Sequence, residues 1–480
     1  MRPFLFVEPA TRSELTCIGE IPVAGRIAGH KLTLQKLADM KLGVIGAGPV
    51  GLVTAGAFSS LGHQVLCVEK DPVRLKQLTN GSIPLYEPGL QELVQQGVDK
   101  GSLNFTNDMG EVLRFANVVF VCVGTPEGEE GAADLSQVES VAVDVARNLP
   151  GYRLLIEKST VPIGTHRHIA RTISRHVGRD AEFDVACIPE FLREGNAVHD
   201  FFNPDRIIIG VGSDRSRALI EDLYSSFDCE KVWTDPGTAE LVKHASNAFL
   251  ALKISYSNLL ADMSEATGAN LGALLDGVGG DSRIGRSFLN PGVGYGGSCL
   301  PKDVRAFVHF STQAGVDSSM LAEAQKINER RPVQIVDKVR DALWLLNDKP
   351  VTVWGLSFKP ETDDVRNAPS LDVVRQLLEA GAKVTCHDPV AISRFREAFD
   401  EHPDLRYEAD MYEAAQDSHA LILLTEWSQY KDADLAKVRS SMTIPLIIDG
   451  RRVFDPEMVD GLGFEYEAFG SGKPPKRHGA

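Results

Sequence analysis

The sequence lacks paired cysteines. Its seven cysteines stand at positions 17, 67, 122, 187, 229, 299 and 386, and no CxxC pair occurs. An odd number of widely separated thiols argues against a disulfide framework and against a zinc site, so no metal is predicted. Most of these cysteines are expected to be small buried groups in a reducing compartment, and a cytoplasmic location is predicted.

The sequence also lacks a basic excess and long apolar runs. Acidic residues outnumber basic ones by 66 to 50, giving a formal net charge of −16. Nucleic-acid binding requires a basic surface, so no nucleic-acid partner is predicted. No apolar run reaches the roughly 18 residues of a membrane span, so no membrane partner is predicted either. The hydrophobic share of 43% and the length of 480 residues suit a folded protein of about three domains.

Residues 1–39 show neither the long apolar region of a secretory signal nor a regular pattern. We expect this segment to be a poorly ordered extension or, alternatively, the result of a wrongly assigned start with Met40 as the true initiator. The first convincing strand begins directly after Met40.

Short apolar segments alternate with helical ones in two parts of the chain. The first part predicts strands at 42–45, 64–69, 118–124, 154–158 and 183–188, and the second at 351–355, 383–387, 420–425 and 445–449. Runs rich in Val, Ile and Leu suit parallel strands covered on both faces. Between the two parts, residues 238–267 predict one long helix with an apolar stripe that includes Leu241, Leu259 and Met263 and ends at Gly268.

The predicted fold class is α/β, with two Rossmann-like doubly wound sheets joined by a long central helix and a helical middle domain. We expect an N-terminal extension at 1–39 and a first sheet domain at 40–235. A central helical domain at 236–340 and a second sheet domain at 341–480 follow, the latter ending in a flexible tail from Gly470.

A dinucleotide site is predicted at the first strand–helix junction. Gly46, Gly48 and Gly51 form a GxGxxG motif there, which permits a tight turn and a close approach of the backbone to a pyrophosphate. Glu69, 18 residues after Gly51, can accept hydrogen bonds from ribose hydroxyls and would repel a 2′-phosphate. NAD is therefore predicted over NADP, with FAD as a lesser alternative. The corresponding loop of the second part, 355–360, lacks the three glycines.

Two threonines follow predicted strands of the first sheet. Thr125 and Thr160 stand where strand ends should border the ligand crevice. Each could bind cofactor or substrate hydroxyls, or merely cap a turn.

A glycine-rich segment delivers Cys299 to a predicted helix start, with Pro301 and Asp303 in the first turn. Backbone N–H groups and the helix dipole are expected to stabilise a thiolate there and make Cys299 a nucleophile, although an inert buried cysteine is the alternative. Lys243 and Asn247, four residues apart on one helix face, could hold an oxyanion or simply face solvent.

Two carboxylates follow the strand predicted at 183–188. Glu190 lies at its C-terminal end, where a carboxylate is placed to act as a general base. Glu194 could be no more than a surface charge.

Together these motifs resemble the UDP-glucose/GDP-mannose dehydrogenase family over about residues 41–460. The resemblance is carried by GAGPVG, IPLYEPGL at 83–90, VGTP, EKSTVP, PEFLREG, ELVKHASNAFLALKISY at 240–256, GVGYGGSCLPKD, GLSFKPETDDVR at 355–366 and DGRR at 449–452. It implies that the C6 alcohol of a sugar nucleotide is oxidised to a carboxylate with two NAD+, through a thiohemiacetal and a thioester on a cysteine.

The resemblance also assigns roles to single positions. The implied catalytic residues are the nucleophile Cys299, the oxyanion-stabilising Lys243 and Asn247, the proton-handling Asp303, and Glu190 and Thr160, which act on water. The implied cofactor contacts are Gly46, Gly48, Gly51, Glu69, Lys70, Arg74, Thr125 and Thr160. The implied substrate contacts are Phe191, Leu192, Arg193, Glu194, Lys243, Asn247, Arg283, Phe288, Gly296, Phe358, Lys359 and Arg451. Aspartate is common in the family where this chain has Glu69.

The resemblance further implies a homodimer or higher homo-oligomer, with Arg283 reaching the substrate of a neighbouring subunit and the long helix at the subunit interface. The UDP-glucose branch of the family is favoured, and GDP-mannose or a UDP-N-acetylhexosamine is the alternative sugar nucleotide. A β-hydroxyacid dehydrogenase, which performs one oxidation without a cysteine, and a non-catalytic sugar-nucleotide binder are the more distant alternatives.

Overall fold

The computed structural model describes residues 39–128, 131–177 and 182–471. Of the predicted N-terminal extension only residue 39 falls within these ranges, and the tail beyond residue 471 lies outside them. None of the helices described in these ranges is long and apolar enough to cross a membrane.

The first sheet has eight strands in the order β3-β2-β1-β4-β5-β6-β7-β8. Neighbouring strands run parallel, except that β6 and β7 meet in an antiparallel pair at Cys187 and Gly210. All five strands predicted for this part are confirmed, whereas β3, β7 and β8 were not predicted. The strands are β1 (Lys41–Ile45), β2 (Gln64–Val68), β3 (Leu103–Thr106), β4 (Val118–Val121), β5 (Arg153–Glu157), β6 (Phe183–Cys187), β7 (Arg206–Gly210) and β8 (Glu230–Thr234).

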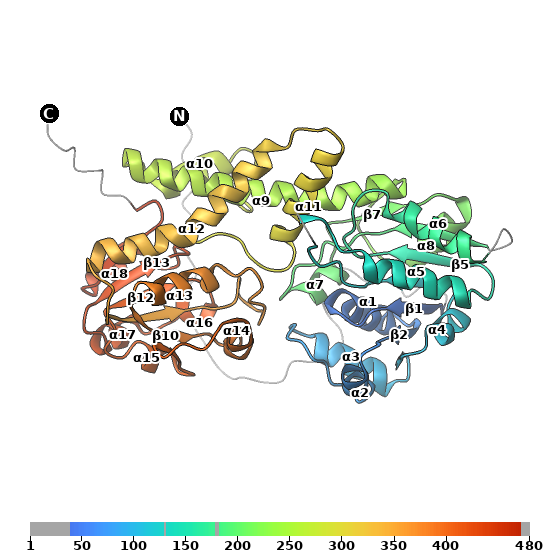
Figure 1. The fold of residues 1–480 in the computed structure, drawn as a ribbon, viewed down its shortest axis with the longest axis horizontal. Coiled ribbons are helices and arrows are strands. Elements are labelled where there is room, and N and C mark those ends of the chain that lie inside the picture. The colour runs from blue at the N-terminus through green and yellow to red at the C-terminus, as the bar shows by residue number, and fades with distance from the viewer. Residues whose placement is uncertain (1–38, 129–130, 178–181, 472–480) are drawn as a thin grey trace, which may run out of the picture. The chain divides into compact units, whose positions relative to one another are not determined.

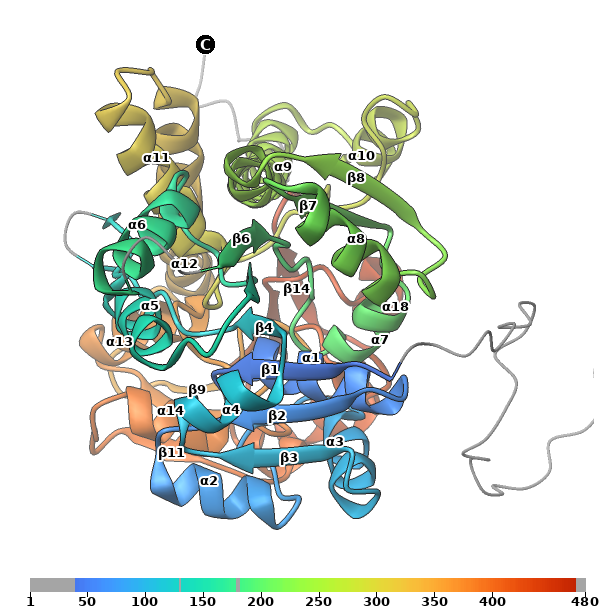
Figure 2. The same cartoon turned by 90° about the vertical axis from the view of Figure 1, so that its right-hand side faces the viewer.

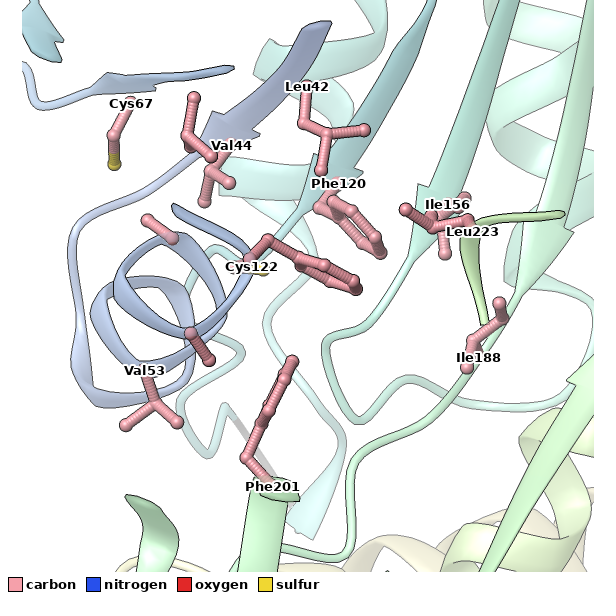
Figure 3. Close-up of a cluster of buried hydrophobic side chains, with 14 of the residues drawn as sticks. Leu42, Val44, Val53, Cys67, Phe120, Cys122, Ile156, Ile188, Phe201 and Leu223 are labelled. Carbon is pink, nitrogen blue, oxygen red and sulfur yellow. The ribbon is translucent and has the colours of Figure 1, made fainter. Parts of the chain in front are cut away.

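Helices cover this sheet and enclose its core (Figures 1 and 2). They are α1 (Pro49–Ser60), α2 (Pro72–Thr79), α3 (Leu90–Asp99), α4 (Met109–Phe115), α5 (Ser136–Asn148), α6 (Thr165–Val177), α7 (Ala197–Phe202) and α8 (Asp214–Leu223). Figure 3 shows side chains of β1, β4, β5, α1 and α7 meeting in one cluster, in which Leu42, Phe120 and Ile156 are completely buried. Each such side chain stabilises the fold by about 1.5–3 kcal/mol.

The predicted long helix is α9 (Pro236–Thr267). It begins two residues before the prediction because the Asp235 carboxylate accepts a hydrogen bond from the N–H of Thr238 at 3.0 Å and caps the first turn. It ends, as predicted, at Gly268, which is left-handed with φ 76°. The predicted apolar stripe, however, is not its buried face, since Leu241, Leu259 and Met263 are 38–52% exposed.

Three helices follow α9, namely α10 (Leu271–Gly279), α11 (Leu300–Gln313) and α12 (Ser319–Leu343). The helix predicted to start with Pro301 in its first turn is α11, and Cys299 is its N-cap. The side chain of Ser255 on α9 donates a hydrogen bond to the carbonyl of Ala324 on α12 at 2.7 Å. Small buried side chains on α9, such as Ala251 and Ser255, allow this close packing.

The second sheet is entirely parallel, with six strands in the order β11-β10-β9-β12-β13-β14. This order repeats that of the first six strands of the first sheet, which confirms the predicted pair of Rossmann-like sheets. The four predicted strands are present, and β11 and β14 were not predicted. The elements are β9 (Pro350–Trp354), α13 (Pro369–Glu379), β10 (Lys383–His387), α14 (Ile392–Ala398), β11 (Leu405–Tyr407), α15 (Met411–Ala414), β12 (Ala420–Leu423), α16 (Ser428–Lys431), α17 (Leu435–Ser441), β13 (Leu446–Asp449), α18 (Pro456–Gly461) and β14 (Glu465–Ala468).

In the first loop of the second sheet, backbone N–H groups donate to a side chain of the same domain. The N–H groups of Leu356 and Ser357 both donate to the Asp388 carboxylate, at 2.7 and 3.1 Å. They are therefore not presented to a pyrophosphate, in line with the missing glycines. At the other end of this part, Gly470 has a defined place, because its N–H donates to the Glu265 carboxylate at 2.7 Å. The predicted flexible tail therefore does not begin at Gly470.

Candidate active site

A cavity of about 1120 Å³ gathers most of the predicted substrate and catalytic residues. Its walls come from the loop after β6, from α9, from the segment that leads into α11 and from the loop after β9. The predicted residues that line it are Glu190, Phe191, Leu192, Arg193, Glu194, Lys243, Asn247, Phe288, Gly296, Cys299, Phe358 and Lys359. Side chains separated by more than 160 positions in the sequence therefore share one cavity.

Cys299 is the one exposed cysteine among the described residues; Cys67, Cys122, Cys187 and Cys386 are buried and Cys229 is half-buried. This exposure agrees with an accessible thiol at Cys299, whose role as a nucleophile stays a prediction. Its thiolate is not stabilised as expected, however. The surrounding protein and the carboxylates of Glu190 and Asp303 raise the pKa of the Cys299 thiol, and together they outweigh the opposing effect of Lys243. The prediction of a lowered thiol pKa was therefore wrong, because it considered only the helix terminus.

Lys243 and Glu190 form a buried ion pair, with Nζ and Oε1 3.0 Å apart. Burial alone would lower the pKa of Lys243, but the Glu190 carboxylate reverses the effect and raises it, with smaller contributions from Cys299 and Asp303. Lys243 therefore carries a positive charge next to the Cys299 thiol, and its side chain does not face solvent. The second oxygen of Glu190 accepts the N–H of Leu192 at 2.6 Å, which fixes the carboxylate to its own loop.

Asn247 and Asp303 also meet directly. The amide of Asn247 on α9 donates to Asp303 Oδ2 at 2.6 Å, and Lys302 donates to Oδ1 at 2.8 Å. Both Asn247 and Asp303 are buried. The first turn of α11, which carries Cys299 at its start, is thereby tied to the helix that carries Lys243.

Thr125 and Thr160 lie together at the ends of neighbouring strands, away from the walls of the cavity. The hydroxyl of Thr125 donates to the backbone carbonyl of Thr160 at 2.7 Å. The structure thus shows Thr125 holding the chain after β5, which agrees with the turn-capping alternative for that residue.

The glycine loop between β1 and α1 fits a dinucleotide. Gly46 has φ +100°, and a Cβ on Gly51 would lie 1.8 Å from the Gly46 carbonyl oxygen, so the tight turn requires both glycines. A Cβ on Gly48 would meet no atom within 4 Å. Open space therefore lies beside the backbone at the N-terminus of α1, where a pyrophosphate is expected to sit.

Glu69 follows β2 with its carboxylate largely buried. It accepts the N–H of Asp71 at 2.9 Å and lies 3.8 Å from Arg74 Nε. Arg74 in turn donates to the carbonyl of Ala47 at 2.9 Å and so borders the glycine loop. The exposed Lys70 donates a hydrogen bond to the half-buried Asp144 at 3.0 Å.

The loop after β6 carries Arg193 and Glu194 in different environments. Arg193 forms a two-point ion pair with Asp200, at 2.8 and 2.6 Å. Glu194 is half-buried, accepts the hydroxyl of Thr362 at 3.2 Å, and is not the surface charge considered above. Burial and the nearby Asp364 raise the pKa of Glu194 to about 7.

Two predicted substrate arginines do not line the cavity. Arg283 is exposed and pairs with Asp281 within the same turn. Arg451 donates to the carbonyls of Leu424, Gly294 and Phe358, at 2.8, 3.1 and 3.2 Å, and so joins three chain segments.

Sequence reasoning missed Lys158, which lines the cavity and is only 6% exposed. Burial lowers the pKa of Lys158, while Cys122 and Glu190 oppose that effect. Its place at the end of β5, two residues before Thr160, was the available signal. Within the described ranges, no group of three or more His, Cys, Asp or Glu side chains is placed to hold a metal ion.

Three family models match the chain in sequence order. They are the NAD binding domain, the central domain and the UDP binding domain of the UDP-glucose/GDP-mannose dehydrogenase family, at residues 40–228, 237–330 and 352–456. The chain is 41% identical to UDP-glucose 6-dehydrogenase of Pseudomonas aeruginosa, over 92% of this chain and 99% of that one. It is 40% identical to UDP-glucose 6-dehydrogenase TuaD of Bacillus subtilis, over 90% and 93%.

A solved structure is similar over the same length. It is a UDP-glucose dehydrogenase from the hyperthermophilic archaeon Pyrobaculum islandicum, with a TM-score of 0.84 and 37% sequence identity. The match covers 90% of this chain and 98% of that chain.

Proposed function

Because this chain belongs to the UDP-glucose/GDP-mannose dehydrogenase family, we propose that it oxidises UDP-glucose to UDP-glucuronate in two steps on one carbon. NAD+, when bound at the Gly46–Gly51 loop, accepts one hydride in each oxidation. Relatives about 40% identical over nine-tenths of the chain are named for this substrate, which favours UDP-glucose over the other sugar nucleotides of the family.

The observation that carries the proposal is the exposed thiol of Cys299 in a cavity that also presents Lys243 and Asn247. A single oxidation of an alcohol needs no nucleophile, whereas an aldehyde held as a thiohemiacetal can be oxidised again at the same carbon. The Cys299 sulfur bonds to the aldehyde carbon, and its proton ends on the former carbonyl oxygen. Loss of a second hydride and of that hydroxyl proton leaves a thioester on Cys299.

Lys243 and Asn247 are placed to stabilise negative charge on the C6 oxygen. Their side chains reach the cavity from one face of α9, and the ammonium and the amide are both donors. Each becomes available by shifting its present partner, Glu190 for Lys243 and Asp303 for Asn247. Asp303, which is buried and does not itself line the cavity, can accept through water the proton that leaves the C6 hydroxyl.

Water then breaks the carbon–sulfur bond of the thioester. The carbon gains a hydroxyl group, and the thiol of Cys299 regains a proton. We propose that Glu190 accepts the proton of the attacking water, because its carboxylate lines the cavity and is fixed by Leu192. Thr160 is proposed to help position this water from the loop that Thr125 holds.

A panel of sugar nucleotides tests the substrate. Initial rates of NADH formation are measured with UDP-glucose, UDP-N-acetylhexosamines and GDP-mannose at equal concentrations. We expect a kcat/KM for UDP-glucose at least tenfold above the others, since a missing or additional buried group costs about 1–3 kcal/mol. NADH formation with GDP-mannose but not with UDP-glucose would refute the choice.

We also propose a homodimer or a higher homo-oligomer built on α9. Five large apolar side chains on this helix are exposed, between 38% and 61%, namely Leu241, Phe249, Tyr256, Leu259 and Met263. Such a surface is typical of a contact between protein chains. Size-exclusion chromatography with light scattering should give a mass of two or more chains, and substitution of Met263 and Leu259 by glutamate should reduce it.

We further propose a cytoplasmic location. All six described cysteines are free thiols, and the reaction requires Cys299 to stay reduced. Fractionation of cells that express the protein, followed by immunoblotting, should place it with the cytosolic proteins.

A further inference from the structure

The IPLYEPGL motif has no part in the reaction described so far, yet it places a buried carboxylate against the substrate loop. Glu87 lies in the connection between α2 and α3 and is only 5% exposed. Its Oε2 accepts the N–H of Gly195 at 2.8 Å, and its Oε1 accepts the N–H of Ala197 at 2.8 Å. Glu87 therefore contacts residues more than 100 positions away in the sequence.

Both donors belong to a bend whose local backbone hydrogen bond, from the N–H of Asn196 to the carbonyl of Arg193 at 2.8 Å, leaves them without an acceptor. Gly195 is left-handed, with φ +78°, and a Cβ there would lie 2.5 Å from the carbonyl oxygen of Glu361. Ala197 is the first residue of α7, and N–H groups at a helix start lack partners within the helix. The asparagine that precedes α7 makes no side-chain cap. Glu87 supplies both missing acceptors from another part of the fold.

The chain just before this bend forms the wall of the cavity. Glu190 to Gly195 all line it, and Glu190 pairs with Lys243 at its beginning. Glu87 fastens the other end of the same short segment. With the two ends fixed, the backbone between them is held in one position in the cavity that Cys299 also lines.

The charge of Glu87 is not taken up by any cation in a direct ion pair of the described structure. Burial raises the pKa of Glu87, and the two backbone N–H groups and the more distant Lys359 oppose this rise without cancelling it. A carboxylate kept in this place is consistent with a positioning task, because two N–H donors are best accepted by two charged oxygens.

We propose that Glu87 is a positioning residue that sets the sugar-binding loop after β6. It acts through the backbone of Gly195 and Ala197 and does not itself line the cavity. This inference rests on the proposed function, since it assigns the loop to the sugar of the UDP-glucose substrate. The expected consequence is that loss of Glu87 weakens recognition of the glucosyl group and leaves the recognition of NAD and of UDP intact.

The test compares Glu87→Gln and Glu87→Asp in the full chain with Glu92→Gln, an exposed glutamate of the first turn of α3. Glutamine keeps the size but replaces one acceptor by a donor that faces an N–H, and aspartate keeps both acceptors but is shorter. For each protein we measure the KM for UDP-glucose, the Kd for UDP, the KM for NAD and the Tm.

We expect Glu87→Gln to raise the KM for UDP-glucose about tenfold or more, the effect of losing one hydrogen bond to a charged group. The Kd for UDP and the KM for NAD should stay within about twofold of the wild type. Glu87→Asp should also raise the KM for UDP-glucose selectively, but by a smaller factor. This second variant keeps the test decisive if Glu87→Gln does not fold. Glu92→Gln should behave as the wild type.

Two results would overturn the proposal. One is an unchanged KM for UDP-glucose in both Glu87 variants. The other is an equal weakening of UDP, UDP-glucose and NAD, which would show a merely structural role. Failure of the wild-type protein to turn over UDP-glucose would instead refute the proposed function, so the two failures are distinguishable.

Discussion

Lys243 and Glu190 form an ion pair of 3.0 Å that joins α9 to the loop after β6. Both groups act on the thiol of Cys299, but with opposite signs, since Lys243 lowers its pKa and Glu190 raises it. Alongside the surrounding protein and the Asp303 carboxylate, which also raise the thiol pKa, the reactivity of the nucleophile therefore depends on the balance between two charges that neutralise each other in the structure.

This balance predicts opposite effects of two substitutions on Cys299 alkylation. Lys243→Met removes the positive charge and should slow the reaction of Cys299 with iodoacetamide at constant pH, because it reduces the thiolate fraction. Glu190→Gln removes the negative charge and should accelerate it. Each effect is expected to be on the order of tenfold. The rates are measured by intact-protein mass spectrometry between pH values that bracket the thiol titration.

The buried cysteines are the internal control for that experiment. Burial raises the pKa of Cys122 to about 12, so Cys122 should stay unlabelled while Cys299 reacts. Acceleration by Lys243→Met, or changes of the same sign in both variants, would contradict the proposed balance.

Glu69 is predicted to select NAD over NADP. Glu69→Gln removes the negative charge that accepts ribose hydroxyls and repels a 2′-phosphate. Arg74 donates to the carbonyl of Ala47 and therefore stays beside the glycine loop. The KM for NAD should rise about tenfold, and the ratio of kcat/KM for NAD to that for NADP should fall. Steady-state kinetics with both cofactors measure this. An unchanged ratio would remove Glu69 from cofactor selection.

A buried carboxyl behind the site should make stability depend on pH. Glu157 at the end of β5 is completely buried, and burial raises its pKa to about 8. In the folded state it keeps a proton that the unfolded chain releases near its ordinary value of 4.5. Raising the pH between these two values therefore favours the unfolded state, so the free energy of unfolding should fall across that interval.

Glu157→Gln carries no such proton and should flatten that dependence. Its Tm should exceed that of the wild type by about 2 °C or more at pH values above about 8, and the gain should disappear in acid. Glu401→Gln, at an exposed position, is the matched control. A gain that is equal at both ends of the pH range would show that the titration of Glu157 is not its cause.

The glycine loop could be predicted from the sequence because its requirement is local. Gly46 and Gly51 contact each other within six residues, and this local contact alone excludes a side chain at Gly51, although the backbone of Cys122 also approaches Gly46. Of the five missed strands, β3, β8, β11 and β14 form sheet edges, whereas β7 is an internal and buried apolar strand that the pattern did contain. β8 carries Glu230 and Lys231 and forms the edge of its sheet, so it shows no buried apolar run.

The face that α9 buries could not be predicted from its apolar periodicity. Leu259 is 42% exposed, whereas Ala251 and Ser255 are 1% exposed. Close contact with neighbouring helices selects small side chains, and a hydrophobicity pattern does not record that distance. The three backbone carbonyls that Arg451 contacts belong to separate chain segments, so these contacts could not be predicted from the sequence either.

The charge state of Cys299 likewise depends on distant residues. Its place at a helix start is visible in the sequence, but Glu190 lies more than 100 positions away and raises the pKa of the thiol. Family resemblance predicted residues that the structure brings together in one cavity. The direction of the thiol shift required their positions in space.

In the proposed mechanism, Cys299 allows two oxidations of one carbon. This is tested by the amount of NADH formed per UDP-glucose consumed, with the product identified by mass spectrometry after complete turnover. We expect two NADH per UDP-glucose and UDP-glucuronate as the product. One NADH per UDP-glucose, with an aldehyde as the product, would contradict it.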